Sequence, residues 1–138
     1  MVTGQKVVTD VIGLLRGSVL AEALRGNIYR EGTRPRDSKA EDLVVIFTTA
    51  DAAQFQEGVI TLNIYVPDLP TAENGVNVVD SARCEEIEGL AQQTVDALKA
   101  YRSNYLFKLR EAIHTQRDED IDQSFVVVRL RFKYLSNN

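Results

Sequence analysis

The single histidine, His114, is the first residue to examine for acid–base chemistry. No serine or cysteine lies at a local spacing typical of a nucleophile and its base, so we expect His114 to be a solvated side chain. The single cysteine, Cys84, falls within an apolar stripe, and no neighbouring cation would stabilise its thiolate. We therefore interpret Cys84 as a small core residue. The sequence predicts no catalytic residues and no enzyme.

Carboxylates are concentrated near the C-terminal end, at Asp118, Glu119, Asp120 and Asp122. Oxygen ligands of this kind bind hard cations, but the spacing is not that of a calcium loop, and the central glycine is missing. We interpret the cluster as a solvated hairpin tip and predict no metal and no cofactor. No glycine-rich phosphate loop is indicated either, because the glycines at 13 and 17 belong to an apolar helical pattern.

Positive charges alternate with apolar residues in the two segments on either side of that acidic tip. If both segments are paired strands, their cations share one face of a sheet. These cations are Lys108, Arg110, Arg129, Arg131 and Lys133. Like charges that face each other directly are destabilising, so we expect an anionic partner opposite them.

Two kinds of anionic partner fit this basic patch. A third interpretation of the patch requires no partner. The partner is either an acidic surface of a neighbouring subunit or passing nucleic acid. The acidic candidates on a neighbour are Glu85, Glu86 and Glu88. The alternative is an exposed sheet face that its charges keep in solution.

A polar segment, Glu31 to Asp42, separates the apolar patterns of the front half. It contains glycine and proline, which break regular structure, and loops of this length are uncommon in small domains. One interpretation is a mobile surface loop. The other is an arm that binds a partner through Arg34, Arg36 and Asp37. The segment 67–77 is a second loop that could contact a neighbour.

Periodicity indicates the elements that position these groups. Apolar residues recur every three or four positions in 7–15 and 84–98, which predicts helices, and Ser18 can cap a short helix over 19–24. Strands are predicted at 27–30, 43–49, 58–66 and 125–135, and Gly58 indicates a bulge or a close backbone approach. The segment 105–115 fits a strand or a helix. We favour a strand, because 116–122 then joins two neighbours as a hairpin.

These elements predict an α+β fold, a mostly antiparallel sheet of four to five strands with helices packed on one face. The 138 residues fit one domain, 1–138. A net charge of −4 argues against a dedicated nucleic-acid binder. A lone cysteine excludes an internal disulfide and indicates a reducing compartment. No apolar run reaches the roughly 20 residues of a membrane span, and the N-terminus has no signal-peptide pattern, so we expect no membrane contact.

The order of the elements resembles that of the tail-terminator and tail-completion proteins of long-tailed bacteriophages. The resemblance covers nearly the whole chain and depends on three features. They are Ile28-Tyr29 after the first helices, the strand that carries Thr61-Leu62-Asn63-Ile64-Tyr65-Val66, and the back half, in which a helix leads to two closing strands ending in Val126-Val127-Val128-Arg129-Leu130-Arg131-Phe132.

This resemblance implies a structural virion protein without catalytic residues or cofactors. The expected assembly is a homo-hexameric ring on the head-proximal end of the tail tube, built in the cytoplasm of the bacterial host. Such a ring contacts the tail tube protein, ends tube polymerisation and offers a surface to the head–tail connector protein. DNA passes through its lumen without sequence-specific binding. From the residues alone, the alternative is a non-enzymatic α/β adaptor domain that binds a protein through an exposed sheet edge.

Overall fold

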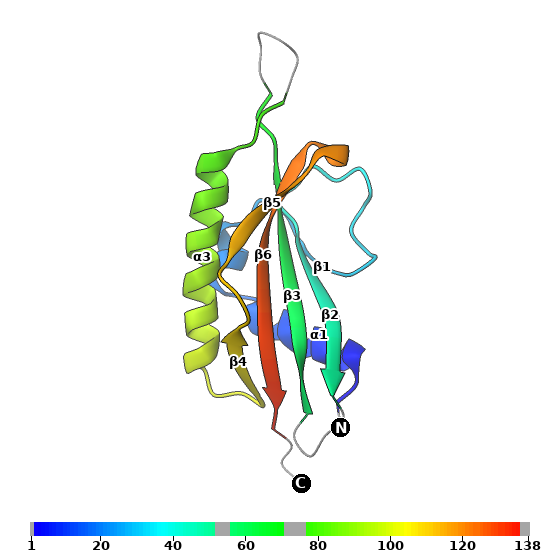
Figure 1. Cartoon of the computed structure of the whole chain (residues 1–138), viewed down its shortest axis with the longest axis vertical. Helices are drawn as coiled ribbons and strands as arrows, with labels where there is room; N and C mark the ends of the chain where they lie inside the picture. Colours follow the sequence, from blue (N-terminus) through cyan, green and yellow to red (C-terminus); the bar gives the residue numbers. More distant parts are fainter. Residues whose placement is uncertain (1, 52–55, 71–76, 136–138) are drawn as a thin grey trace.

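The computed structural model describes residues 2–51, 56–70 and 77–135. Across these residues the chain forms an α+β fold, a mixed, mostly antiparallel sheet with three helices packed against it (Figure 1). The helices are α1 (Gly4–Leu15), α2 (Val19–Ala23) and α3 (Ser81–Ala100), with a 3-10 turn η1 (Glu119–Ile121). The strands are β1 (Ile28–Arg30), β2 (Leu43–Asp51), β3 (Gln56–Pro67), β4 (Tyr105–Leu109), β5 (His114–Asp118) and β6 (Gln123–Tyr134).

The sheet has the strand order β1-β2-β3-β6-β4, and β5 also pairs with β6. β1 runs parallel to β2, and the other pairs are antiparallel. β3 and β6 pair along their whole 12-residue lengths, so they form the centre of the sheet. The predicted fold class is confirmed. The sheet has six strands rather than the expected four to five, because residues 105–118 form two strands, β4 and β5, where one was expected.

The segment 105–115 is extended, as favoured, but it is not one continuous strand. Leu109 pairs with Leu130 and His114 pairs with Val127, so five steps along this segment match three steps along β6. Two extra residues are therefore accommodated between β4 and β5, where Glu111 and Ala112 are exposed. Because the number of extra residues is even, side chains that point to one face of the sheet before the break still point to that face after it. The predicted hairpin is present between β5 and β6, but its connection is 119–122 rather than 116–122, because residues 116–118 pair with β6 as part of β5.

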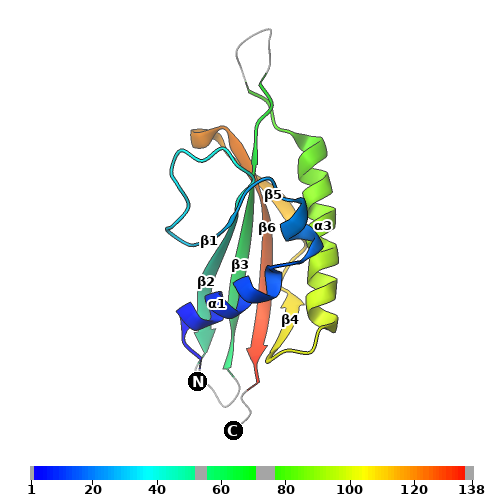
Figure 2. The same ribbon diagram turned by 180° about the vertical axis from the view of Figure 1, so that it is seen from behind.

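All three helices cover the same face of the sheet, as the view from behind shows (Figure 2). The core contains Val11 of α1, Leu20 of α2 and Ile87 of α3, packed against the alternate residues of the strands that point toward them. Ser18 caps α2 by accepting a hydrogen bond from the Ala21 N–H at 3.1 Å. Cys84 is buried in this core, as predicted.

Gly58 marks a place where two strands approach closely. A methyl group there would lie 2.3 Å from the Thr49 carbonyl oxygen and 2.8 Å from both the Ala50 Cβ and the Phe132 ring. Of the two alternatives predicted for Gly58, the close backbone approach is confirmed. The bulge lies elsewhere: the register of β2 against β3 shifts between Phe47 and Thr49, whereas Gly58 pairs regularly with Ala50 and Phe132.

Replacing Gly58 by alanine is expected to lower the free energy of unfolding by about 1–3 kcal/mol, because backbone must move to admit the methyl group. The matched control is Gly89→Ala in the exposed interior of α3, where nothing lies within 4 Å of the added Cβ. That change is expected to stabilise the protein by about 0.5–1 kcal/mol. Urea unfolding of both variants measures the two effects, and equal effects of the two substitutions would contradict the prediction.

Candidate interaction surface on the open sheet face

The face of the sheet opposite the helices carries the predicted basic residues, and we call it the open face. Strand register decides their neighbours. Lys108 on β4 lies directly opposite Arg131 on β6, and Lys133 lies opposite Leu106. Arg110 donates its backbone N–H to the Arg129 carbonyl oxygen at 2.9 Å. The structure therefore brings all five predicted cations onto one surface.

Two of these cations have carboxylate partners. Arg129 lies 2.7 Å from Glu111, in the connection between β4 and β5, and Lys133 lies 3.8 Å from Glu57. The hydrogen bond from Arg129, more than the opposing effect of burial, holds the pKa of Glu111 below its usual value. Within the described part of the chain, the other three cations form no ion pair. These are Lys108, Arg110 and Arg131.

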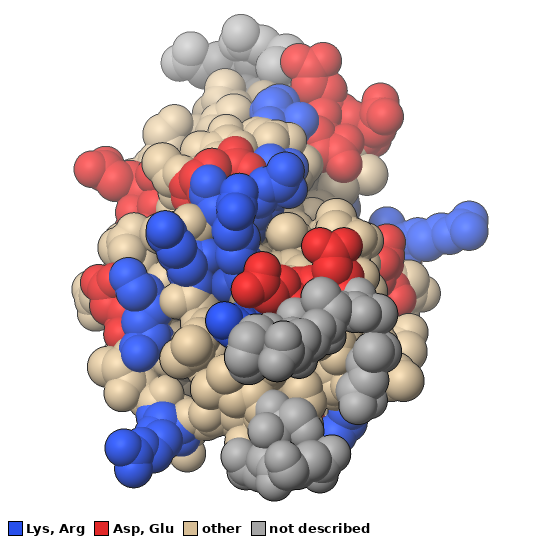
Figure 3. Space-filling view, turned by 60° about the horizontal axis from the view of Figure 1, so that its bottom comes forward, with Lys and Arg blue, Asp and Glu red and all other residues tan. Residues whose placement is uncertain are grey.

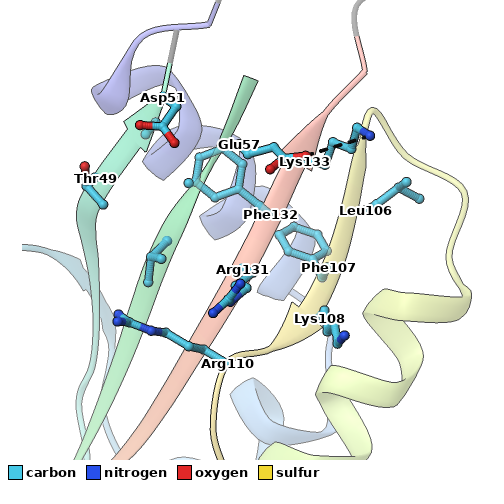
Figure 4. Close-up of a pocket in the computed structure, with 13 residues that line it drawn as sticks. Thr49, Asp51, Glu57, Leu106, Phe107, Lys108, Arg110, Arg131, Phe132 and Lys133 are labelled. Atoms are coloured by element: carbon cyan, nitrogen blue, oxygen red, sulfur yellow. Dashed lines mark ion pairs between the residues drawn. The ribbon is translucent and has the colours of Figure 1, made fainter. Parts of the chain in front are cut away.

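All of these cations except Arg129 border an open concavity of about 420 Å³, which we call the basic concavity. Its floor includes Phe132, and Leu106 on its rim is 56% exposed. Figure 4 shows Lys108, Arg110 and Arg131 toward one end of it, and two carboxylates, Asp51 and Glu57, toward the other. In the space-filling view, Lys and Arg side chains gather in the middle of the face, with acidic side chains next to them (Figure 3). The surface is therefore locally positive but mixed.

The sequence interpretation missed the two carboxylates that line this concavity. Glu57 could have been found, because it lies one residue before the predicted strand 58–66, in step with Val59, and pairs with Lys133. Asp51 could not, because the bulge between Phe47 and Thr49 shifts the register and brings Asp51 opposite Glu57. Without that bulge, Asp51 would share the helix-facing side with Val45.

The predicted partner-binding loop divides into an anchored arginine and two exposed residues. The Arg34 guanidinium lies 2.9 Å from the Asp42 carboxylate, donates to the Gln123 side-chain oxygen at 3.0 Å and lies 4.0 Å from the centre of the Tyr65 ring. Arg34 thus fastens the loop to one end of the open face. Arg36 and Asp37 are exposed. Of the three residues, these two are the ones available to a partner.

The groups first considered for catalysis are placed apart from one another. His114 is half-exposed on β5, where its Nδ1 lies 3.0 Å from the Ala112 carbonyl oxygen. Burial of Cys84, more than its nearby carboxylates, raises the pKa of its thiol, so the neutral form is favoured. In residues 2–51, 56–70 and 77–135, no group of three or more His, Cys, Asp or Glu side chains is arranged to hold a metal ion.

Comparison of the sequence with models of known protein families gives no match, and comparison with curated proteins gives none either. No helix in the described ranges is both long enough and apolar enough to cross a membrane. The geometry of the open face and the order of the elements are therefore the features that bear on function.

Proposed function

We propose that this chain is a structural subunit that assembles head to tail into a ring, which caps the tail tube of a long-tailed bacteriophage. In this role it ends tube polymerisation and offers a surface for head–tail joining. The observation that carries the proposal is the direct opposition of Lys108 and Arg131 on an open sheet face, with no carboxylate paired to either among the described residues. The order of helices and strands, which resembles that of tail terminators, supplies the biological setting.

Two like charges at paired positions weaken a sheet unless an anion lies between them. The chain carries a net charge of −4, so another copy of it offers many carboxylates. A contact between the basic surface of one copy and a different, acidic surface of the next is heterologous. Such contacts close into a ring when the rotation per subunit divides the circle, and otherwise form a filament.

A projecting arm supports an assembly role as well. Its described base, residues 67–70 and 77–79, extends from the end of β3 and returns to α3 (Figure 1). Leu69 and Val78 form a bridge there with two backbone hydrogen bonds, yet their side chains are 47% and 44% exposed. Residues 71–76 of the predicted 67–77 loop lie outside the described residues. Apolar side chains on a projection fit contact with a second protein, such as the tube or the connector.

The adaptor alternative is favoured by one feature, the edge of β2. β1 pairs with Leu43, Val44 and Val45 only, so Ile46 to Asp51 of β2 lie beyond the pairing with β1. A peptide strand could add there. However, the bulge at Phe47–Thr49 and the charge of Asp51 are features that discourage strand addition. We therefore favour the ring.

The proposal is tested by mixing the purified chain with the tail tube protein encoded in the same genome. We expect rings of about six copies by light scattering and electron microscopy, and tubes that stop growing once capped. Lys108→Glu with Arg131→Glu is expected to abolish ring formation and capping, because both cations then repel an acidic neighbour. The control is Arg102→Glu, an exposed change in the connection between α3 and β4. A wild-type chain that leaves tube growth unchanged and binds a peptide as a monomer would support the adaptor instead.

A further inference from the structure

We propose that the basic concavity of one copy binds the acidic 3-10 turn of the next. We define this acidic turn by its three exposed carboxylates, Glu119, Asp120 and Asp122. The inference rests on the proposed self-assembly and names the contact that would produce it.

The acidic turn is the best-matched anionic surface that the described residues offer. Its carboxylates have no ion pair within the described part of the chain. The acids of α3, expected from the sequence to fill this role, are partly engaged. Glu86 lies 3.1 Å from Arg83, and Glu88 accepts a hydrogen bond from Thr115 at 2.6 Å. The turn therefore offers more charge that is not already paired.

The turn is also held in a fixed shape. Asp122 adopts a left-handed backbone conformation, with φ of 52°, and closes η1 before β6 begins. Arg117 on β5 forms an ion pair with Asp68, whose carboxylate is almost fully buried. The Asp68 N–H in turn donates to the Asp122 carbonyl oxygen at 3.2 Å. A convex group that is already ordered loses little conformational entropy when it binds.

The position of the two surfaces makes the contact intermolecular. The acidic turn precedes Gln123 at the start of β6, and the basic concavity surrounds Arg131 near its end. Eight residues of extended chain span about 26 Å, so the turn of one copy cannot reach its own concavity. Two different surfaces at opposite ends of one strand give a heterologous contact, as a ring requires.

The mixed charge of the concavity favours a compact acidic knob over a nucleic-acid strand. Asp51 and Glu57 line the same hollow as the cations. A phosphate backbone crossing the whole hollow would meet these carboxylates, whereas a small turn can seat against Lys108, Arg110 and Arg131 alone. The exposed Leu106 on the rim can pack against apolar parts of the turn, such as the half-exposed Ile121.

The test is a charge swap in the full-length chain, with self-association measured by sedimentation velocity at low ionic strength. Glu119→Lys with Asp120→Lys, and separately Lys108→Glu with Arg131→Glu, are each expected to weaken self-association by about a hundredfold or more, since like charges then meet at the contact. The chain that carries all four changes, and an equimolar mixture of the two double variants, are expected to regain self-association. Glu85→Lys on α3 is the matched control and is expected to have little effect.

Several results would overturn the inference. In one such result, the Glu119→Lys, Asp120→Lys variant associates as strongly as the wild type, whereas the Glu85→Lys variant dissociates. That result would assign the contact to α3. Another is failure of the four-change chain to associate although its thermal unfolding matches the wild type. A third is a wild-type chain that stays monomeric, or whose self-association is unchanged when a single-stranded oligonucleotide occupies the concavity. Tube capping is measured separately, so it can succeed even if this contact is absent.

Discussion

Replacing Glu41 by alanine is expected to lower the free energy of unfolding by about 3–5 kcal/mol, because it removes the buried counterion of a buried guanidinium and leaves Arg83 only the exposed Glu86. Arg83 near the start of α3 makes two hydrogen bonds to the Glu41 carboxylate, each 2.7 Å long. The two side chains are 9% and 6% exposed. Urea unfolding measures the loss as a lower midpoint at an unchanged slope.

The same pair predicts how stability depends on pH. Burial raises the pKa of Glu41, but hydrogen bonds from Arg83 and from the Arg25 N–H outweigh it, so the pKa lies below its usual value. A carboxyl group whose pKa is lowered by folding stabilises the protein above its unfolded pKa, near 4.3. That stabilisation is lost as the pH falls through the lowered folded pKa. Glu41→Gln is therefore expected to flatten the acid limb of the stability profile.

The control separates loss of a partner from loss of packing. Changing Glu41 and Arg83 together to methionine removes both charges, so it is expected to cost much less than the single change at Glu41. Arg83 also donates to the Ala23 carbonyl oxygen at 2.8 Å, so some cost persists in the double variant. If Glu41→Ala changes the free energy of unfolding by less than about 1 kcal/mol, the Glu41–Arg83 pair does not anchor α3 to the end of the loop 31–42.

Replacing Phe132 by alanine is expected to cost about 3–5 kcal/mol, because a large, almost fully buried ring leaves a cavity in the centre of the sheet. Its ring centre lies 6.3 Å from that of Phe47 on β2 and 5.9 Å from that of Tyr105 on β4, in an edge-to-face arrangement with the latter. The Phe132 side chain thus contacts aromatic rings from strands on either side of β6. Thermal and urea unfolding both report the loss.

The control for this prediction is Phe132→Leu, which keeps most of the apolar volume and is expected to cost less than the alanine change. Because Phe132 also lines the basic concavity, the alanine variant is expected to weaken self-association even at temperatures where it stays folded. A variant whose stability falls by less than 1 kcal/mol would mean that the neighbouring rings close the space. If the space stays open instead, alanine at Gly58, whose added methyl group would meet the Phe132 ring, is expected to be better tolerated in the same background.

The sequence by itself determined the types of the elements and the side on which the cations lie. Alternation along β6 separates Val128 and Leu130 from Arg129 and Arg131, and a strand fixes that separation locally, since successive side chains point to opposite faces. The helices follow from apolar spacing in the same way. These features depend on residues close together in the chain, so they could be predicted without knowing the packing.

Only the tertiary structure decided which charged side chains form ion pairs or hydrogen bonds inside the molecule and which stay on its surface without a partner in the chain. Arg34, expected to meet a partner, is held by Asp42 and Gln123, the second of which lies 89 residues away. The break between β4 and β5 and the bulge in β2 each place extra residues on one strand opposite a shorter stretch of its partner. Such outcomes depend on contacts between distant segments, and no local pattern encodes the distance between those segments once the chain has folded.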